Sequence, residues 1–366
     1  MEDLLGAWAR SASALLPPSV RVWDAHTHTG ATDPDGRTLT AVELLEGLAT
    51  AGHEAAVVCS SADPDGYEAA NGRVLAEATA SDGRLVPFLR VDPNRADAAD
   101  AARRWLDAGH RGVKLHPRSD GFGFGDPGVH AVLDVAAERR VPVLVHAGRA
   151  MPPLGRVILD HLDARPGLTI VLAHAAISDL GWVAAASAGR SGLVFDTAWW
   201  NPADHAALFS WVDASQILYA SDAPYGWPTM SATITTRSAV QAGLAGHALE
   251  AVFGGNLRRI LEGRDRSPLG RGVAFRPPLE LRRVASNLHA AIGAIFGGGD
   301  PAQGVELARR ACETEDTPFD ALLGAVGRLL DDASATDGLD RLRALVVALA
   351  VAVTPAAGFV GDRTTR

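Results

Sequence analysis

The 366-residue chain has little of what marks a secreted or membrane-bound protein. Its two cysteines, Cys59 and Cys312, lie far apart and form no C-x-x-C spacing, which excludes a disulfide framework and a thiolate zinc site. The most apolar run, 344–353, is far shorter than the roughly 20 residues that span a bilayer, so we expect a buried helix there. The N-terminal segment, with Glu2 and Asp3, lacks the basic start and apolar stretch of a signal peptide. A cytoplasmic location is expected.

Positive charge is also scarce. The formal net charge is -9, acidic and basic residues are interspersed, and lysine is nearly absent in favour of arginine. A protein that binds nucleic acid or a membrane surface usually carries a basic stripe or patch, and none is visible in this sequence. We therefore expect the partner to be a small-molecule substrate, with no nucleic acid and no membrane involved.

The chain does contain one repeated pattern, in which an apolar, β-rich run ends in a polar loop and an amphipathic helical pattern follows. Strands that are covered on both faces read as near-continuous runs of valine, leucine and isoleucine. Eight such strands alternating with helices over about 250 residues predict a parallel (β/α)₈ TIM barrel, with a doubly wound open sheet as the competing architecture. The predicted strands are 20–25, 55–59, 85–91, 112–115, 141–145, 169–173, 192–197 and 216–220.

The pattern ends near residue 263, after which three prolines mark a linker and only helical patterns follow. We expect an all-helical C-terminal appendage used for packing, for covering the barrel or for forming a homodimer. The predicted division is an N-terminal helix in 1–19, the barrel in 20–263 and the helical C-terminal region in 264–366. The four predicted C-terminal helices are 279–296, 305–313, 319–333 and 339–353.

Polar side chains occur where several predicted strands end. The carboxyl ends of barrel strands meet at one face, so these side chains should converge there. Imidazole and carboxylate ligands around an open position are typical of a site for Zn²⁺ or a similar divalent ion. The residues are His26 and His28 of the first strand, Lys114 and His116 of the fourth, His146 of the fifth, His174 of the sixth and Asp222 of the eighth.

These motifs resemble the amidohydrolase superfamily, and in particular its amidohydrolase-related (amidohydrolase 2) branch. The resemblance rests on the His-x-His pair and on Gly-Val-Lys-Leu-His-Pro, Val-Leu-Val-His-Ala-Gly, Ser-Asp-Ala-Pro and Gly-Gly-Asn-Leu-Arg-Arg-Ile-Leu. It covers roughly residues 20–263 and leaves out the helical C-terminal region. It implies a metal-dependent hydrolase on a TIM barrel.

The resemblance also implies roles for individual residues. It implies that His26, His28, His146 and Asp222 bind one divalent metal, and that His174 contacts substrate or a second metal. In other branches a carboxylated lysine of the fourth strand bridges two metals. Whether Lys114 does so, acts as a cation near substrate or pairs with a carboxylate stays open. Zn²⁺ is the first expectation, with Mn²⁺ or Fe²⁺ as alternatives and one or two ions per chain.

A mechanism follows from such a metal. A bound divalent ion lowers the pKa of its water from about 15.7 toward about 7. Asp222 would take the proton of that water and pass it to the leaving group, while His174 would help to polarise the scissile carbonyl. The expected reaction is cleavage of a C–N or C–O bond in an amide, lactam or lactone. The alternatives are a decarboxylase or hydratase of a small aromatic or muconate-like acid, and an inactive metal-binding scaffold.

Residues for substrate binding are sought among aromatic and basic side chains that follow the predicted strands on the same face. Aromatic rings can line a pocket, and arginine can hold a carboxylate through two hydrogen bonds. The candidates are His116, Arg118, Arg149, Trp199, Trp200 and Tyr225.

Overall fold

The computed structural model describes residues 2–33, 36–148, 151–199 and 201–358. Within these ranges, parallel strands form a three-stranded sheet, β1-β2-β3, and a six-stranded sheet that runs in order from β4 to β9. The strands are β1 Trp23–Thr29, β2 Ala55–Ser60, β3 Leu85–Pro87, β4 Leu89–Arg90, β5 Val113–Leu115, β6 Pro142–Val145, β7 Thr169–Leu172, β8 Leu193–Asp196 and β9 Ile217–Leu218.

The two sheets join at both edges to close a barrel. At one junction the chain passes from β3 to β4 through Phe88, whose N–H donates to the carbonyl of Val58 over 2.8 Å. At the other junction β1 runs beside β9, and the N–H of Ala25 donates to the carbonyl of Tyr219 over 2.9 Å. The predicted third strand, 85–91, is therefore β3 together with β4. The predicted barrel is confirmed.

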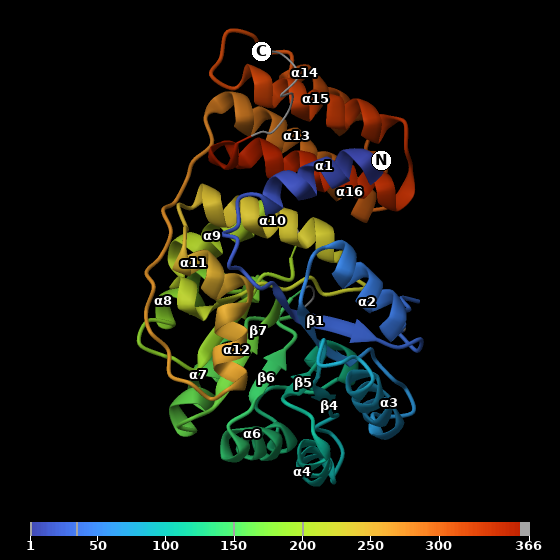
Figure 1. Cartoon of the computed structure of the whole chain (residues 1–366), viewed down its shortest axis with the longest axis vertical. Coiled ribbons are helices and arrows are strands. Elements are labelled where there is room, and N and C mark those ends of the chain that lie inside the picture. The colour runs from blue at the N-terminus through green and yellow to red at the C-terminus, as the bar shows by residue number, and fades with distance from the viewer. Residues whose placement is uncertain (1, 34–35, 149–150, 200, 359–366) are drawn as a thin grey trace.

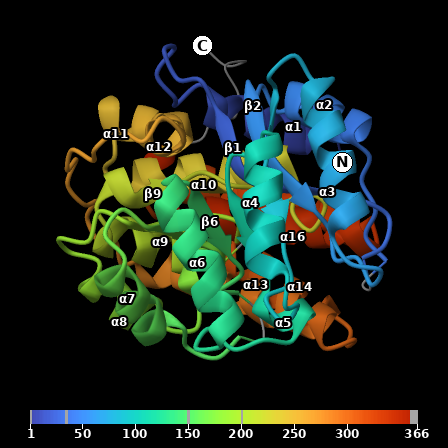
Figure 2. The same cartoon turned by 90° about the horizontal axis from the view of Figure 1, so that it is seen from below.

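Helices cover the outside of the barrel, as seen in Figure 2. Because each helix returns the chain to the start of the next strand, the carboxyl ends of all strands stay on one face. The helices of this part are α2 Ala41–Thr50, α3 Glu68–Thr79, α4 Ala98–Ala108, α5 Pro117–Asp120, α6 Pro127–Arg139, α7 Gly155–Ala164, α8 Leu180–Ala186, α9 Pro202–Trp211, α10 Pro228–Gln241, α11 His247–Glu250 and α12 Asn256–Leu261, with short turns η1 Ala173–Ala176, η2 Ala214–Gln216 and η3 Ala251–Gly255.

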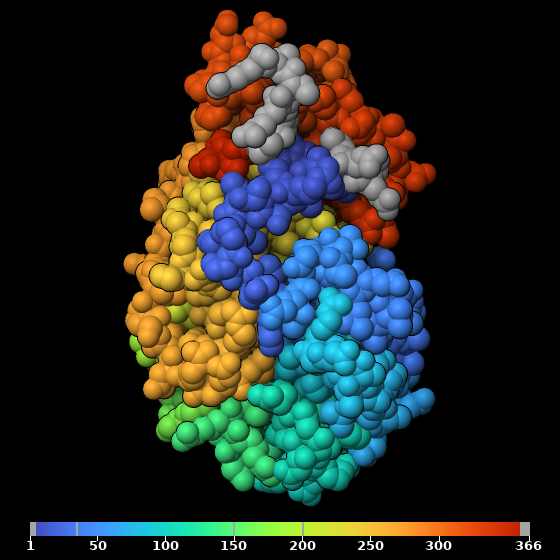
Figure 3. Space-filling view, in the orientation of Figure 1, coloured from blue at the N-terminus to red at the C-terminus, as the bar shows by residue number. Residues whose placement is uncertain are grey.

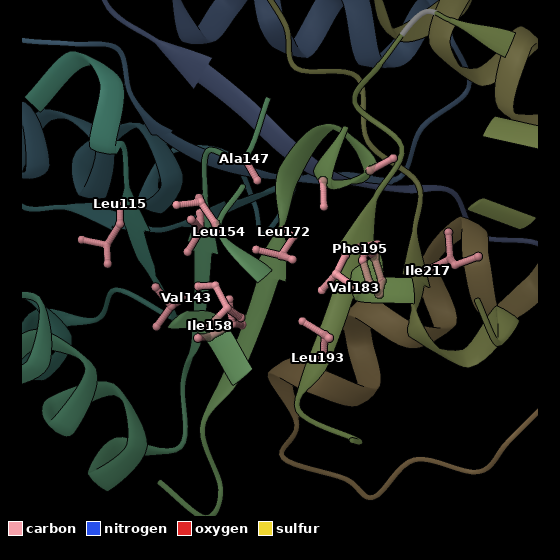
Figure 4. Close-up of a cluster of buried hydrophobic side chains, with 14 of the residues drawn as sticks. Leu115, Val143, Ala147, Leu154, Ile158, Leu172, Val183, Leu193, Phe195 and Ile217 are labelled. Carbon is pink, nitrogen blue, oxygen red and sulfur yellow. The ribbon is translucent and has the colours of Figure 1, made fainter. Parts of the chain in front are cut away.

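The apolar strand residues supply two layers of core, because side chains alternate between the faces of a strand. In β6, Val143 and Val145 pack outward toward the helices, whereas Leu144 packs into the barrel interior. Figure 4 shows the outer layer, in which Ile158 of α7 and Val183 of α8 lie against the strands. The barrel interior is thus filled by side chains, and chemistry is confined to its ends.

A second core joins both ends of the chain. Helix α1 Glu2–Ser13 and the C-terminal helices α13 Leu279–Phe296, α14 Ala302–Ala311, α15 Asp320–Ser334 and α16 Gly338–Val353, followed by η4 Pro355–Ala357, enclose it with α10. Figure 1 shows these helices stacked on α10 at the opposite end of the molecule from α4 and α6, and Figure 3 shows α1 lying across them. The division at residues 19/20 and 263/264 stays a prediction.

The apolar run 344–353 forms most of α16 and is buried in this second core, apart from a partly exposed Val353. Among the described residues, no helix is both long enough and apolar enough to cross a membrane.

Candidate metal centre

The histidines of β1 point to one side of the strand, into the carboxyl end of the barrel. His26 and His28 are both buried, and their Nε2 atoms lie 3.0 Å apart. The intervening Thr27 points the other way and donates its hydroxyl to the carbonyl of Val57. The two-residue period of the strand therefore pairs the two imidazoles.

Asp222 joins this pair from the loop that follows β9. Its Oδ1 lies 3.3 Å from Nε2 of His26 and 3.2 Å from Nε2 of His28. The residue adopts a left-handed backbone conformation with φ of 61°, and its N–H donates to the carbonyl of His26 over 2.8 Å. Within the described ranges these three residues are the one group of histidine, cysteine or carboxylate side chains close enough to hold a metal ion.

Lys114, the single lysine of the chain, also reaches this point. It lies on β5, is fully buried, and its Nζ is 2.7 Å from Nε2 of His26. Burial lowers its pKa, although nearby acidic groups oppose the shift. The structure therefore brings Lys114 to the cluster, while its carboxylation stays a prediction.

The donor set of His26, His28 and Asp222 fits a divalent metal. Ligand atoms that each lie about 2.1 Å from one ion at angles of about 90 to 110° are about 3.0 to 3.4 Å apart, which matches the separations of 3.0, 3.2 and 3.3 Å here. Burial and the neighbouring Lys114 lower the pKa of His26, which leaves it a neutral ligand. The Asp222 side chain retains 15% of its exposure, so the group is open on that side.

The pKa values of His28 and Asp222 are shifted in opposite directions. For His28, burial opposes protonation, but the Cys59 thiol and the Asp222 carboxylate outweigh it and raise the pKa to about 9. Burial raises the pKa of Asp222, yet the hydrogen bond from His28 and nearby positive groups bring it below its usual value. Asp222 is therefore the negatively charged member of the group.

His146 and His174 lie beside the cluster and contact each other. Nε2 of His174 is 3.0 Å from Nδ1 of His146, and Nδ1 of His174 donates to the carbonyl of Ala198 over 2.6 Å. A Cβ at Gly148 would lie 2.4 Å from the His174 ring, so a residue with a side chain at this position would clash with the ring. The ring centre of His174 lies 5.6 Å from that of His26. The metal-binding roles of His146 and His174 stay predictions.

The residues predicted to bind substrate are spread more widely. His116 stacks on His146 with ring centres 4.0 Å apart, and Tyr225 lies edge-on to His28 at 5.6 Å. The Tyr225 hydroxyl donates to Asp33, away from the ring contact. Trp199 is near His174, at 6.4 Å between ring centres. Arg118 is exposed on α5, and Arg149 and Trp200 lie outside the described residues.

Sequence reasoning missed Asp196, the last residue of β8. It is fully buried, and its Oδ2 accepts the Nδ1–H of His26 over 3.0 Å. Its Oδ1 accepts the N–H groups of His174 and Ala198 over 2.8 and 2.9 Å. A carboxylate on the outer nitrogen of a metal-binding histidine fixes its tautomer and orientation. The signal was available, because Asp196 closes an apolar strand as Asp222 follows one.

Asp24 also supports His26, by accepting a hydrogen bond from its backbone N–H group. Its Oδ1 accepts the N–H groups of His26 over 3.2 Å and of Ser221 over 2.9 Å, which ties β1 to the chain just before Asp222. Burial raises the pKa of Asp24 to about 7, against these hydrogen bonds. Asp24 therefore fixes the relative position of His26 and Asp222.

We expect Asp196→Asn to weaken divalent-metal binding by roughly 10- to 100-fold, because His26 loses its charged partner. Chelator competition with Zn²⁺ on the purified full-length chain measures this. Asp163→Asn is the matched control, since Asp163 is an exposed partner of Arg190. Equal metal affinity in both variants would show that Asp196 does not support the site.

Comparison with known proteins gives a family match for the barrel. A family model described as amidohydrolase matches residues 23–263. A search of curated protein sequences gave no significant match.

Solved structures give fold-level similarity. One, described as an amidohydrolase II, is 20% identical, with 66% of this chain and 99% of that chain covered and a TM-score of 0.52. A 5-carboxyvanillate decarboxylase from Sphingomonas paucimobilis is 16% identical, with 67% and 99% covered and a TM-score of 0.53. A 2,6-dihydroxybenzoate decarboxylase from Rhizobium is 15% identical, with 66% and 99% covered and a TM-score of 0.54. About a third of this chain thus has no counterpart in these structures.

Proposed function

Because the chain belongs to the amidohydrolase family of enzymes, whose members are generally metal-dependent, we propose that it is a metal-dependent hydrolase. It would cleave a C–N or C–O bond in an amide, lactam or lactone. The observation that supports this most directly is the convergence of His26, His28 and Asp222 on one partly open point at the carboxyl end of the barrel. We propose Zn²⁺ as the metal, since two imidazoles and a carboxylate suit it.

When bound to these ligands, a divalent ion supplies an acidified water and a Lewis acid. The residues of the chain do the rest. Asp222 has a lowered pKa and is ionised at neutral pH, so it can accept a proton from the attacking water and return it to the leaving group. Asp196 holds the Nδ1–H of His26, which directs the Nε2 lone pair of that ring toward the ligand cluster.

His174 is proposed to polarise the scissile carbonyl. Its Nδ1–H already donates to Ala198, so only Nε2, which now faces His146, can turn to a substrate, and it can donate only when the ring is protonated. The substrate is proposed to be a small molecule that fits between Trp199 and Tyr225. A cytoplasmic location is proposed from the two cysteines, both of which are free thiols.

Decarboxylation of a small aromatic acid is the second candidate. It is favoured by the fact that two of the similar structures are decarboxylases of such acids. The same ligand set serves either reaction, because both need an ion that polarises a carboxylate or carbonyl group.

One assay separates the candidates. We expect the Zn²⁺-loaded full-length chain to release acid from at least one lactone or amide of a broad panel, and to release no carbon dioxide from hydroxybenzoates. Chelation should remove this activity and added Zn²⁺ should restore it. Carbon dioxide release without hydrolysis would replace the proposal with the decarboxylase, and stoichiometric metal with no turnover would indicate a scaffold.

A further inference from the structure

The C-terminal helices α13–α16 lie outside the matched family region, yet they contact two loops of the catalytic face. These loops are 197–201, which follows β8 and is described except at residue 200, and 222–227, which follows β9. Loop 222–227 carries Asp222, and loop 197–201 carries Ala198, whose carbonyl accepts the Nδ1–H of His174. These contacts can therefore affect the geometry of the metal centre as well as the stability of the fold.

The first contact holds loop 222–227. The guanidinium of Arg343, on α16, lies over the Trp227 ring at 4.1 Å from its centre. Trp227 also packs against the second core, and α10 begins at the next residue, Pro228. A cation over the face of an indole is attracted by the ring, and a half-buried pair gains more than an exposed one.

Loop 222–227 is short, and hydrogen bonds within it connect its first residue, Asp222, to residues near its end. The N–H groups of Tyr225 and Gly226 donate to the carbonyl of Asp222 over 2.8 and 3.0 Å. A Cβ at Gly226 would lie 2.0 Å from the carbonyl of Ser221, so the turn is closed tightly on itself. Holding Trp227 in place therefore also holds Asp222.

The second contact holds loop 197–201. Nε2 of His289, on α13, lies 3.3 Å from Oδ1 of Asn201, the residue that caps α9 by accepting the N–H of Ala203. Because Nδ1 of His289 faces the carbonyl of Ala285 over 2.9 Å, this contact is a hydrogen bond when both ring nitrogens carry a proton, and a packing contact otherwise. A few residues earlier in the same loop, the carbonyl of Ala198 accepts the Nδ1–H of His174. The C-terminal helices thus reach the support of His174 as well as that of Asp222.

We propose that the C-terminal helices brace the metal centre, with Arg343 and His289 as positioning residues for the loop that carries Asp222 and for the loop that supports His174. Strand β1 already holds the start of the first loop through hydrogen bonds at Asp222 and Ala223, and the appendage holds its other end at Trp227. The metal-binding half of this inference rests on the proposed function, whereas the bracing of the loops does not.

The test is hydrogen exchange on the full-length chain, compared between Arg343→Met, Arg343→Lys and Arg283→Met. Arg283 is an exposed residue of α13 and serves as the matched control. We expect at least tenfold faster exchange of the Tyr225 and Gly226 amides in Arg343→Met, partial rescue in Arg343→Lys because the cation remains over Trp227, and no change in Arg283→Met. His289→Leu should speed exchange of the amides of residues 197–199 and 201 in the same way.

Chelator competition with Zn²⁺ on the same variants gives the second measurement. About tenfold weaker affinity in Arg343→Met, with wild-type affinity in Arg283→Met, is the expected result. Unchanged exchange in both loops would overturn the brace. Equal acceleration throughout α13–α16 would also overturn it, because Arg343 would then stabilise its own helices alone. If the wild-type chain binds no divalent metal, the proposed function fails, but the exchange data still decide the brace.

Discussion

Replacing Asp222 with asparagine is expected to lower kcat by about a thousandfold while the chain keeps its metal. Asparagine retains an oxygen at the position of Oδ1, which lies 3.2 to 3.3 Å from the two Nε2 atoms. It cannot accept and return a proton, and loss of a general base typically costs 10²- to 10⁴-fold, that is, about 3 to 5 kcal/mol of barrier. Steady-state kinetics on the substrate identified by the panel, together with metal analysis, measure both effects.

Two outcomes would contradict this role. Full turnover in Asp222→Asn with full metal content would show that another residue is the general base. Loss of metal together with activity would make Asp222 chiefly a ligand. Asp163→Asn, at an exposed ion pair, should change neither quantity.

Replacing Arg237 with methionine is expected to destabilise the chain by roughly 3 kcal/mol. Arg237 is fully buried on α10, and burial lowers its pKa to about 10. Its guanidinium donates over 3.0 Å to the Thr354 hydroxyl, the Thr354 carbonyl and the Gly358 carbonyl. Methionine fills much of the volume but leaves the buried Thr354 carbonyl and hydroxyl groups without their donor, which costs about 1 to 3 kcal/mol for each group. Urea unfolding followed by circular dichroism measures the loss.

Arg258→Met is the matched control. Arg237 lies over the Trp8 ring at 5.3 Å, and Arg258 lies over the Trp23 ring at 5.6 Å. The hydrogen bond of Arg258 to the Arg21 carbonyl is long at 3.3 Å and lies at the surface. Its loss should cost about 1 kcal/mol or less. Equal destabilisation in both variants would mean that the three bonds of Arg237 contribute little.

The arrangement of the barrel could be predicted because it depends on local pattern. Runs such as Val-Pro-Val-Leu-Val bury both faces of a strand, and helices between them force the strands to run parallel. Polar residues directly after such runs then lie on one face, which is why the sequence pattern alone places His26, His28, Lys114 and Asp222 together.

Contacts that depend on side-chain direction could not be predicted in this way. The pattern could have placed Asp196 at the end of its strand, but only the closed barrel shows that its Oδ2 accepts the Nδ1–H of His26. The Tyr225 ring lies beside His28 while its hydroxyl donates to Asp33, and Arg118 is exposed; their predicted roles in substrate binding stay predictions. Distances between residues far apart in the chain follow from packing, which local pattern does not encode.

The sequence by itself determined the barrel, the face that carries the chemistry and the family to which the chain belongs, because hydrophobic period and motif spacing are local properties. Only the tertiary structure decided how the imidazoles are oriented, which carboxylate supports them and where the C-terminal helices lie. Those helices are amphipathic on any reading of the sequence, but their position on α10, with Arg343 over Trp227 and His289 beside Asn201, depends on long-range packing and on single contacts between distant side chains.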